Sequence, residues 1–594
     1  AATQIFTPNW IVKYMVENTA GKIWLDKHPD SALKGKMKYL VENESDGQNE
    51  AIISEVEELT LIDPACGSGH ILVEGFDLLY QMYMEEYYTP EEAVASILKN
   101  NLFGLDIDDR APQLATFAIL LKAAKVYPDV WTKDWLPQVH AMPEAQNFSQ
   151  QELKDFLGAE GEDYLEELND ALRLMKQAKN LGSVMKLKLS EEAHTYINQR
   201  FEELKTASYR DFNVEAVYQS IQNYIPVLLL LIKKYSSVVA NPPYMGQKNM
   251  NGDLKNYLGT AYISSRNDLM TVFMEVCNEF TCQSGRYANI NLPSWMFLAS
   301  YKDLRLNLLK KNSIDSLVLM GRGVFGSDFG SVSFSILKKK SSSAGTYRKL
   351  SEDKVSVESI VEKERKFLDH NYGLYKLDQS VFLKLPDQPI SFWLSNKEYN
   401  AFEKVTPLLD FATPVQGLAT GENVEFLRFW QEVDFNDIGL NNSSIEEFHE
   451  SKAKWAPYNK GGELKKWFGN DYYVIAFDQK NFNVLSTQGN RLPSKQFYFN
   501  SSISWSKVTL GGLGFRYFPK GFVFDVSGCS VFGTDDNLKY LMGALNSSLK
   551  ESFVYSLSQS ANYEVGQIKA FPIILDESRK TKITQIVNDC IDIT

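Results

Sequence analysis

LTLIDPACGSGH, residues 59–70, is a short apolar run that leads into a glycine-rich turn. The apolar run predicts a strand over 59–63, and the pattern that follows predicts a helix over 71–84. The same pair recurs, because 102–107 has the pattern of a second strand and 112–126 that of a second helix. A strand, a turn, a helix and another strand in this order are typical of the α/β class, so the stretch predicts a parallel sheet.

The turn between the first strand and the first helix has the residues that a ligand-binding turn needs. Gly67 and Gly69 let the backbone approach a ligand closely, and the N-terminus of the next helix offers unpaired N–H groups. The turn differs from the GxGxxG pattern and lacks the Lys-Ser or Lys-Thr ending of a phosphate-binding loop. A plain strand-to-helix turn capped by Asp63 is the alternative, and this motif alone leaves both interpretations open.

A carboxylate, Asp106, lies near the end of the second predicted strand. In a βαβ unit this position is suited to accepting hydrogen bonds from the hydroxyls of a ribose. The alternative is that Asp106 and Asp108 only solvate the end of a strand. The glycine-rich turn earlier in the chain favours the ribose interpretation.

The tetrapeptide Asn241-Pro242-Pro243-Tyr244 is the most specific motif, and it follows a predicted strand over 236–240. Its prolines fix φ and remove backbone donors, which leaves carbonyls free to accept. An amine on a heteroaromatic ring is a poor nucleophile because its lone pair is delocalised into the ring. If the Asn241 side-chain oxygen and the Pro242 carbonyl accept from that amine, its lone pair turns toward an electrophile. Tyr244 can then stack on the ring.

Composition and length exclude several classes of protein. A chain of 594 residues predicts more than one domain, and 44% hydrophobic with 23% charged residues exclude collagen-like, coiled-coil and wholly disordered proteins. The longest apolar run, 225–232, is shorter than the roughly 20 residues that cross a bilayer, so we expect no membrane partner. Five cysteines without metal-ligand spacing predict neither a disulfide framework nor a metal site, and they suit a reducing cytoplasm.

The net charge of −13 argues at first against a polyanionic partner such as DNA, but it is unevenly distributed. Residues 201–350 carry 18 basic and 11 acidic side chains, and residues 451–550 carry 13 and 6, so each segment has a charge of +7. The first segment contains the Asn-Pro-Pro-Tyr motif. The charge distribution therefore allows a basic surface near the predicted chemistry.

The pattern of predicted elements divides the chain into three parts. Strands predicted at 236–240, 287–292, 316–320 and 331–337 continue the sheet, so residues 1–340 form one domain. Within it, residues 148–232 are predicted to be a helical insertion. Residues 341–390 are expected to be a connector. Short aromatic runs broken by Gly, Asn and Pro predict a β-rich second domain over 391–594.

Together these motifs resemble the γ class of DNA amino-methyltransferases, which use S-adenosylmethionine. The resemblance covers residues 3–340 and implies a Rossmann-like catalytic domain. It implies that the residues that hold the cofactor are Phe6, Thr7, Pro8, Asp63, Ala65, Gly67, Gly69, Asp106 and Ile107, with Glu144 as a further candidate. It implies that Asn241, Pro242 and Tyr244 are catalytic and that Phe325 holds the target base, with Phe329 as an alternative to Phe325.

The resemblance also bears on the base and the chemistry. Asparagine at the head of the catalytic motif favours adenine N6 over cytosine N4. Ring-carbon methylation of cytosine needs a thiolate in a Pro-Cys context, but Ala65 precedes Cys66, so we expect Cys66 not to be a nucleophile. Magnesium or another metal is not part of the predicted site.

The second domain is similar to the target-recognition domains fused to such enzymes, which implies a mixed α+β domain and double-stranded DNA as the partner. The basic residues predicted to contact DNA are Lys460, Lys465, Lys466, Lys507, Arg516 and Lys520. The whole chain looks most like the PglX-type adenine methyltransferases of BREX phage-defence systems, which implies a bacterial cytoplasmic protein and other defence subunits as further partners. Those proteins are larger, so we expect this chain to be a piece of a longer one.

Three alternatives remain at the level of the sequence. The chain can be the methyltransferase and specificity portion of a combined restriction-modification enzyme. It can also be a non-catalytic DNA-recognition subunit that keeps the cofactor fold as a sensor. A methyltransferase acting on protein or RNA is a third interpretation, because a Pro-Pro-Tyr site also occurs in such enzymes.

Overall fold

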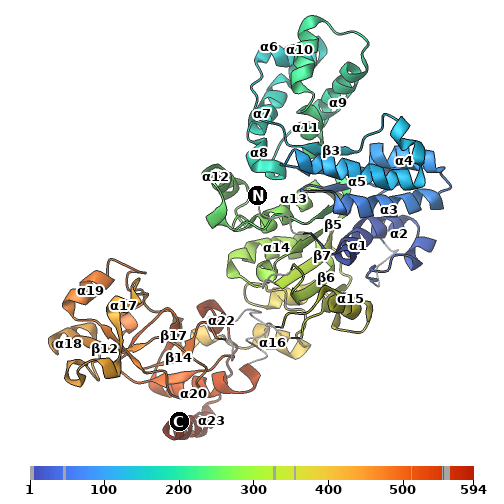
Figure 1. Cartoon of the computed structure of the whole chain (residues 1–594). Helices are drawn as coiled ribbons and strands as arrows, with labels where there is room; N and C mark the ends of the chain where they lie inside the picture. The colour runs from blue at the N-terminus through green and yellow to red at the C-terminus, as the bar shows by residue number, and fades with distance from the viewer. Residues whose placement is uncertain are drawn as a thin grey trace. The chain divides into compact units, whose positions relative to one another are not determined.

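The structure is a computed structural model of the chain, and it describes residues 6–43, 49–325, 330–352, 356–509, 512–550, 553 and 562–594. The chain forms two compact units (Figure 1). Unit 1 comprises residues 1–295 and 300–380, and unit 2 comprises residues 296–299 and 381–594.

A nine-stranded sheet in the order β3-β2-β1-β4-β5-β7-β6-β8-β9 forms the centre of unit 1. Its strands are β1 (Leu61–Asp63), β2 (Leu102–Asp106), β3 (Gln138–Ala141), β4 (Tyr235–Ala240), β5 (Thr281–Asn291), β6 (Ser313–Arg322), β7 (Gly330–Leu337), β8 (Gly345–Lys349) and β9 (Leu374–Leu377). Neighbouring strands from β3 to β5 are parallel, whereas β7 is antiparallel to both β5 and β6. The α/β class and the predicted strands are confirmed, with β1 shorter and β5 and β6 longer than expected.

The chain reverses its direction across the sheet at β1. It passes outward from β1 to β2 and β3, then returns to place β4 on the other side of β1. The carboxyl ends of β1 and β4 are therefore neighbours, with Ile62 opposite Val238 in the register. In open α/β sheets ligands bind at such a reversal. The glycine-rich turn follows β1 and the Asn-Pro-Pro-Tyr motif follows β4, so the fold brings both motifs to this point.

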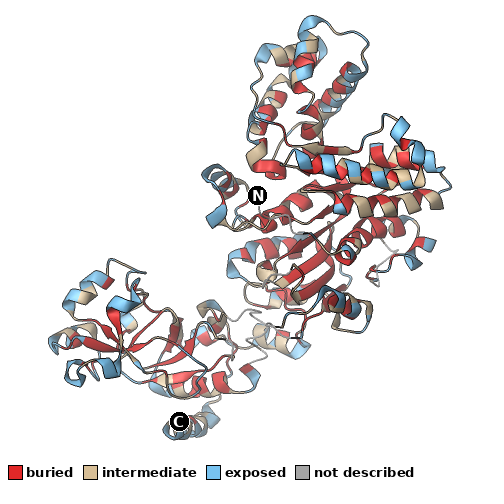
Figure 2. Cartoon of the chain, viewed as in Figure 1, coloured by how far each residue is buried: buried red, intermediate tan, exposed pale blue. Residues whose placement is uncertain are grey.

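Helices cover both faces of the sheet, so its strands are buried on both sides. The helices and short helical turns of unit 1 outside the insertion are α1 (Asn9–Val16), η1 (Glu17–Gly21), α2 (Lys22–Lys27), η2 (Ala32–Gly35), η3 (Val56–Glu58), α3 (His70–Glu85), α4 (Pro90–Ser96), η4 (Ile97–Asn101), α5 (Arg110–Val126), η5 (Pro128–Thr132), η8 (Gln247–Asn249), α12 (Gly252–Ala261), α13 (Leu269–Phe280), η9 (Pro293–Met296), η10 (Ala299–Tyr301), α14 (Lys302–Lys311) and α15 (Ile360–Leu368). Ala288 and Ile290 of β5 share a core with α1, α3 and α5, whereas Asn289 between them contacts Cys277 of α13. Figure 2 shows the strands as almost entirely buried and the helices as buried on one side.

The predicted helical insertion lies between β3 and β4. It consists of α6 (Gln150–Leu157), η6 (Ala159–Tyr164), α7 (Leu165–Met175), α8 (Ala178–Leu181), η7 (Gly182–Val184), α9 (Glu191–Thr206), α10 (Phe212–Ile221) and α11 (Ile225–Ile232). Four of these helices, α6, α7, α9 and α10, show apolar residues at helical spacing that are buried inside the insertion.

Residues 341–390 are not a separate connector, which corrects the expectation from the sequence. β8 pairs in parallel with β6, and β9 pairs antiparallel to β8, so this segment adds two strands to the edge of the sheet. Their hydrogen bonds place residues up to 380 in unit 1. The polar run at 338–345 that suggested a boundary is only the loop that leads into β8.

Unit 2 has two four-stranded sheets, in the orders β10-β17-β14-β15 and β11-β13-β12-β16. Its strands are β10 (Thr413–Val415), β11 (Leu427–Phe429), β12 (Trp455–Asn459), β13 (Tyr473–Ala476), β14 (Ser502–Ser506), β15 (Arg516–Phe518), β16 (Val523–Phe524) and β17 (Gly528–Phe532). Besides η9 and η10, given above, the helical elements that begin in or cross into unit 2 are η11 (Gln379–Lys384), α16 (Asn396–Lys404), η12 (Leu408–Asp410), α17 (Asn423–Phe426), η13 (Trp430–Glu432), η14 (Phe435–Asp437), α18 (Ile445–Glu450), α19 (Gln479–Leu485), η15 (Lys495–Phe497), α20 (Asp535–Asn546), α22 (Val565–Lys569) and α23 (Glu577–Ile593). Each sheet has its own apolar core, so the β-rich pattern of the sequence matches the structure.

No helix among the described residues is long and apolar enough to span a membrane. The same part of the chain contains no cluster of His, Cys, Asp and Glu side chains arranged to hold a metal ion.

Candidate active site

The glycine-rich turn joins β1 to α3 in a conformation that needs glycine at two positions. Gly67 has a φ of 50° and Gly69 a φ of 83°, in the left-handed region. A Cβ atom at Gly69 would lie 2.7 Å from the Cβ atom of Ala115, so α5 packs directly against the turn. A Cβ atom at Gly67 would meet nothing within 4 Å, so that side of the turn is open. Gly69 is the N-cap of α3 and offers no side-chain cap, which leaves the first N–H groups of α3 for an anion.

Asp106 faces this turn from the end of β2. Its Oδ2 accepts a hydrogen bond from the Gly67 N–H at 2.8 Å, and its Oδ1 accepts one from the Asp108 N–H at 2.9 Å. Each carboxylate oxygen keeps a second lone pair, so the group can still accept from a ligand. Ile107 follows with 52% of its surface exposed. The structure thus brings together the glycine turn, a carboxylate and an exposed apolar side chain.

Asn241 and Thr7 are linked although 234 residues separate them. The Asn241 Nδ2 donates to Thr7 Oγ1 at 2.9 Å, and the Asn241 Oδ1 accepts from the Tyr244 hydroxyl at 3.2 Å. In this arrangement the amide nitrogen faces Thr7 and the amide oxygen faces the Tyr244 hydroxyl. Among the described residues, no backbone hydrogen bond reaches the Pro242 carbonyl. An amide oxygen and a backbone carbonyl are the two acceptors that the sequence predicted for an amine.

Tyr244 is fixed by its hydroxyl, whose single hydrogen is shared between Asn241 Oδ1 at 3.2 Å and the Ile290 carbonyl of β5 at 2.9 Å. Burial raises the pKa of the Tyr244 phenol above its usual range, so the hydroxyl stays a donor. The ring of Phe325 lies 6.1 Å from the Tyr244 ring, with their planes inclined by 52°. The two aromatic side chains that the sequence assigned to a target base are therefore neighbours. Phe329, the alternative to Phe325, lies outside the described residues.

The other residues predicted to hold a cofactor lie on segments next to the turn and beyond the end of β3. The Phe6 ring makes an edge contact with the His70 ring, at 5.0 Å between centroids, and Pro8 is the N-cap residue of α1. The Ala65 N–H donates to Asp63 Oδ1 at 3.0 Å. Glu144 lies beyond the end of β3, and its carboxylate approaches Lys179 at 3.7 Å.

Two buried groups at the site have shifted acidity. Burial, with a contribution from Asp106, raises the pKa of the Asp63 carboxyl to about 8. Burial also raises the pKa of the Cys66 thiol well above its usual value, helped by Asp63 and Asp106. A thiol that stays protonated is a poor nucleophile, which agrees with the expectation that Cys66 takes no part in covalent chemistry.

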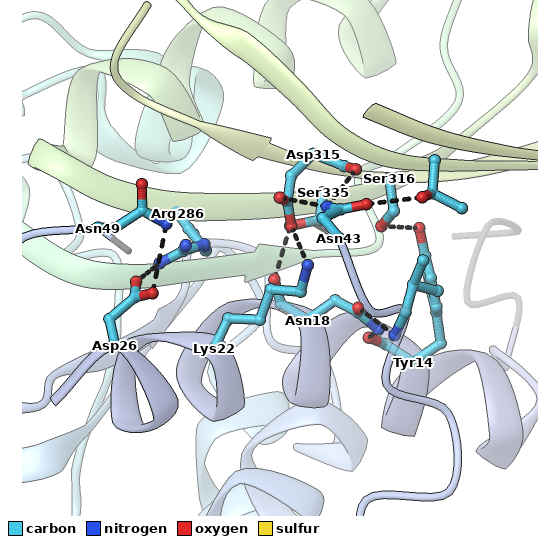
Figure 3. Close-up of polar contacts among 12 residues, drawn as sticks. Tyr14, Asn18, Lys22, Asp26, Asn43, Asn49, Arg286, Asp315, Ser316 and Ser335 are labelled. Atoms are coloured by element: carbon cyan, nitrogen blue, oxygen red, sulfur yellow. Dashed lines mark hydrogen bonds and ion pairs between the residues drawn. The ribbon is translucent and has the colours of Figure 1, made fainter. Parts of the chain in front are cut away.

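Buried polar contacts fasten the N-terminal helical segment, which carries Thr7 at its start, to the sheet (Figure 3). Lys22 forms an ion pair with Asp315 of β6 at 2.9 Å, and Arg286 of β5 forms one with Asp26 at 2.6 Å. All four side chains are at most 8% exposed. Further bonds join Tyr14 to Ser316, Asn43 to Asp315 and Ser335 to the Asn18 carbonyl. The position of Thr7 beside Asn241 therefore rests on contacts along the whole segment.

Sequence reasoning missed several residues that shape the site. Asp268 accepts from the N–H groups of Met245 and Met270, both at 3.1 Å, and so ties the loop after the Asn-Pro-Pro-Tyr motif to the start of α13. An acidic residue before an apolar helix is an N-cap signal that was available. Lys179 and Ser183 of the insertion contact the loops after β2 and β1. No local pattern marks those two residues.

The basic residues predicted to contact DNA differ in their availability in unit 2. Lys465, Lys466 and Lys520 are exposed. Lys460 forms an ion pair with the buried Asp525 at 2.7 Å, and Lys507 forms one with Glu564 at 2.9 Å.

Arg516 is only 1% exposed, so its side chain is not available for the DNA contact that the sequence predicted. Burial lowers the pKa of its guanidinium to about 10, and the group lies over the Phe518 ring at 5.7 Å. Arg516 is part of β15, where its backbone pairs with Ser504 of β14. The alternation of side chains along that strand turns it inward, which a count of charges could not indicate.

Comparisons with known proteins find relatives over nearly the whole chain. Residues 100–325 match the family described as Eco57I restriction-modification methylase. The adenine-specific methyltransferase BrxX of Escherichia coli O9:H4 (strain HS) is 33% identical over 610 residues, covering 97% of this chain and 49% of BrxX. The adenine-specific methyltransferase PglX of Lacticaseibacillus casei (strain Zhang) is 33% identical over 619 residues, covering 97% of this chain and 50% of PglX. The chain thus spans about half the length of these curated relatives.

Solved structures share the fold at low sequence identity. The ATP-dependent Type ISP restriction-modification enzyme LlaBIII, bound to DNA, aligns with a TM-score of 0.53 and 12% identity over 99% of this chain and 39% of that chain. The Type IIL restriction-modification enzyme MmeI, in complex with DNA, aligns with a TM-score of 0.50 and 11% identity over 96% of this chain and 68% of that chain.

Proposed function

We propose that the chain, which is similar to the adenine-specific methyltransferases BrxX and PglX, is a site-specific DNA methyltransferase that transfers a methyl group from S-adenosylmethionine to adenine N6. Unit 1 is the Rossmann-like catalytic domain, and unit 2 is the target-recognition domain. The observation that carries the proposal is that the glycine-rich turn and the Asn-Pro-Pro-Tyr motif lie at the carboxyl ends of the adjacent strands β1 and β4. Thr7 is bonded to Asn241 there at 2.9 Å.

The residues at the turn after β1 fit the proposed cofactor. The open side of Gly67 leaves room for its backbone to approach a ligand, and the uncapped N-terminus of α3 suits the carboxylate of the methionine end. Asp106 has lone pairs left for the ribose hydroxyls, and Ile107 offers an apolar surface next to them. When bound, S-adenosylmethionine supplies a methyl group on a sulfonium, which is an electrophile.

The chain's own residues then prepare the amine. The Asn241 Oδ1 and the Pro242 carbonyl accept hydrogen bonds from the two N–H groups of the target amine, which turns its lone pair out of conjugation with the ring. Tyr244 stacks on the base, and Phe325, whose ring is a neighbour of the Tyr244 ring, borders it. No general base is required before attack, because the amine nitrogen reacts in its neutral form and loses a proton only after it is alkylated.

A base inside a duplex cannot reach this site, so the adenine must be extruded. Extrusion requires a second grip on the DNA, and we assign it to unit 2. The exposed Lys465, Lys466 and Lys520 are the candidates for phosphate contacts there. Lys460 and Lys507 are less suited, because each is already paired with a carboxylate.

The test is labelled-methyl transfer to DNA from a host that lacks the gene, with the wild-type chain and with Asn241→Ala. The variant loses an acceptor at the reacting nitrogen, and we expect transfer to fall at least about 100-fold, as for loss of one group that stabilises a transition state. Binding of S-adenosylhomocysteine by the variant is the control for folding. Undiminished transfer by Asn241→Ala refutes the assignment, and magnesium-dependent cleavage by the wild-type chain favours the combined restriction-modification enzyme instead.

A further inference from the structure

The helical insertion returns to the predicted cofactor loops at one turn, formed by α8 and η7 over residues 178–184. We refer to these residues as the insertion turn. The Ser183 hydroxyl, which is 4% exposed, donates to the Pro64 carbonyl in the glycine-rich turn at 2.6 Å. The insertion is thus bonded directly to the loop between β1 and α3.

Lys179 attaches the insertion turn to the loop after β2. Its Nζ donates to the Ile107 carbonyl at 3.1 Å and forms an ion pair with Asp109. It also lies 3.7 Å from the Glu144 carboxylate beyond β3. One cation therefore joins the segments that follow two neighbouring strands.

Gly182 is the residue of the insertion turn that approaches the Ile107 side chain most closely. A Cβ atom at this position would lie 2.9 Å from Cγ2 of Ile107, so no larger residue fits without moving that side chain. Gly182 also has a φ of 56°, which glycine adopts most easily. The backbone of the insertion turn is therefore packed on one side of Ile107, while Lys179 holds the Ile107 carbonyl.

The other side of the insertion turn is bonded to the segment that follows the Asn-Pro-Pro-Tyr motif. Asn251 donates to Asn180 Oδ1 at 2.6 Å, and the Tyr262 hydroxyl donates to the Val184 carbonyl at 2.9 Å. The turn thus lies between the loops that follow β1 and β2 and the segment that leads into α13. Its position is determined from both sides.

We propose that the insertion turn is a wall of the adenosine pocket, and that Gly182 and Lys179 are positioning residues that hold Ile107 against the adenine ring. This inference rests on the proposed function. The ring is attached to the ribose, so the side chain next to Asp106 is the one that faces the ring. Because Ile107 is held by its carbonyl and by its Cγ2 atom before the ligand arrives, little of the binding free energy is spent on ordering it.

The test measures the affinity for S-adenosylhomocysteine and for 5′-methylthioadenosine, which keeps the adenosine and lacks the amino-acid end. We expect Gly182→Ala to weaken both ligands by about tenfold, because the added methyl group displaces Ile107. Gly158→Ala is the matched control. Gly158 lies in the same insertion at a φ of 71°, but a Cβ atom there would meet only Arg200 at 3.6 Å. Both variants carry backbone strain, and only one touches the proposed pocket.

A second pair of variants keeps the test usable if Gly182→Ala fails to fold. Lys179→Met removes the bond to the Ile107 carbonyl, and the exposed Lys188 of the insertion provides the control Lys188→Met. We expect Lys179→Met, but not Lys188→Met, to bind both ligands more weakly than the wild type does. In a double-mutant cycle, adding Gly182→Ala to Ile107→Ala should cause little further loss of affinity, since Gly182→Ala acts by displacing the Ile107 side chain.

The outcomes separate this inference from the proposed function. If the wild-type chain binds neither ligand, the proposed cofactor site fails. If the wild-type chain binds both and Gly182→Ala binds them as tightly as Gly158→Ala does, the cofactor site stands and the inference about the insertion turn is refuted. Additive effects in the double-mutant cycle also refute the role of Gly182 as a residue that acts through Ile107.

Discussion

Thr7→Val tests whether the first residues of the chain position the proposed catalytic amide. Valine keeps the shape of threonine and removes the oxygen that accepts from Asn241 Nδ2 at 2.9 Å. Without this acceptor the Asn241 amide can turn over, which would present its NH₂ group where the target amine needs an oxygen. The bond that the amide oxygen accepts from the Tyr244 hydroxyl, at 3.2 Å, also depends on the present orientation.

The expected fall in kcat follows from the loss of one hydrogen bond. Such a bond contributes about 0.5–1.5 kcal/mol, and since each 1.36 kcal/mol is a factor of ten in rate, kcat should fall roughly 2- to 13-fold. Thr7→Ser keeps the hydroxyl and should restore most of the rate. In the Asn241→Ala background the change at position 7 should have little further effect, because the amide that it orients is absent.

The assay is steady-state methyl transfer to unmodified DNA at several concentrations of cofactor. If Thr7 acts on Asn241, Thr7→Val lowers kcat; if Thr7 only contacts the cofactor, the variant raises KM and leaves kcat unchanged. Thr195→Val, at an exposed position on α9, is the matched control. A kcat equal to that of the wild type, or an equal fall in Thr7→Ser, refutes the reasoning.

Three further predictions concern acidity, stability and DNA. The folded chain holds the Asp63 proton up to about pH 8, whereas the unfolded carboxyl releases it near pH 4, so this group makes the fold less stable as the pH rises from 4 to 8. Thermal melts should therefore show a smaller decrease in stability from pH 5 to pH 8 for Asp63→Asn than for the wild type. An equal decrease in the two proteins would contradict the raised pKa of Asp63. Lys22→Met breaks a buried ion pair and should lower the free energy of unfolding in urea by roughly 3–5 kcal/mol, whereas Lys34→Met, in an exposed pair, should change it by less than about 1 kcal/mol; similar values for both would count against the anchoring role. Replacing Lys465 and Lys466 by alanine should weaken retention of duplex DNA and reduce the slope of log K against log salt by about 0.9 for each phosphate that is no longer neutralised, and an unchanged slope would remove them from the interface.

Local motifs made much of the fold and the site predictable from the sequence. The glycine turn, Asp106 and the Asn-Pro-Pro-Tyr tetrapeptide are each contiguous with a strand, so their spacing indicates both the sheet and the ends of its strands. A parallel sheet then implies that these ends lie at one edge. The structure has that arrangement, although the roles of the residues in binding and catalysis stay predictions.

Contacts between distant segments were not predictable. The bond from Asn241 to Thr7 and the approach of Gly182 to Ile107 depend on how a helical segment docks, which no short pattern encodes. β8 and β9 were missed because edge strands are short and a polar loop precedes them. Arg516 was predicted to contact DNA because it is a basic residue in a basic segment, but its place in β15 turns it inward.

The ion pair between Lys22 and Asp315 sets an order of events during synthesis. The two residues are 293 positions apart (315 − 22), so the partner of Lys22 emerges from the ribosome long after Lys22 itself. At about 5–20 residues per second, the N-terminal segment waits roughly 15–60 s before its anchor on β6 exists. Until then a lysine that ends up 2% exposed in the finished protein has no buried carboxylate of β6 to meet. A nascent chain arrested before residue 315 should accordingly leave residues 6–43 open to protease while the helical insertion is already protected.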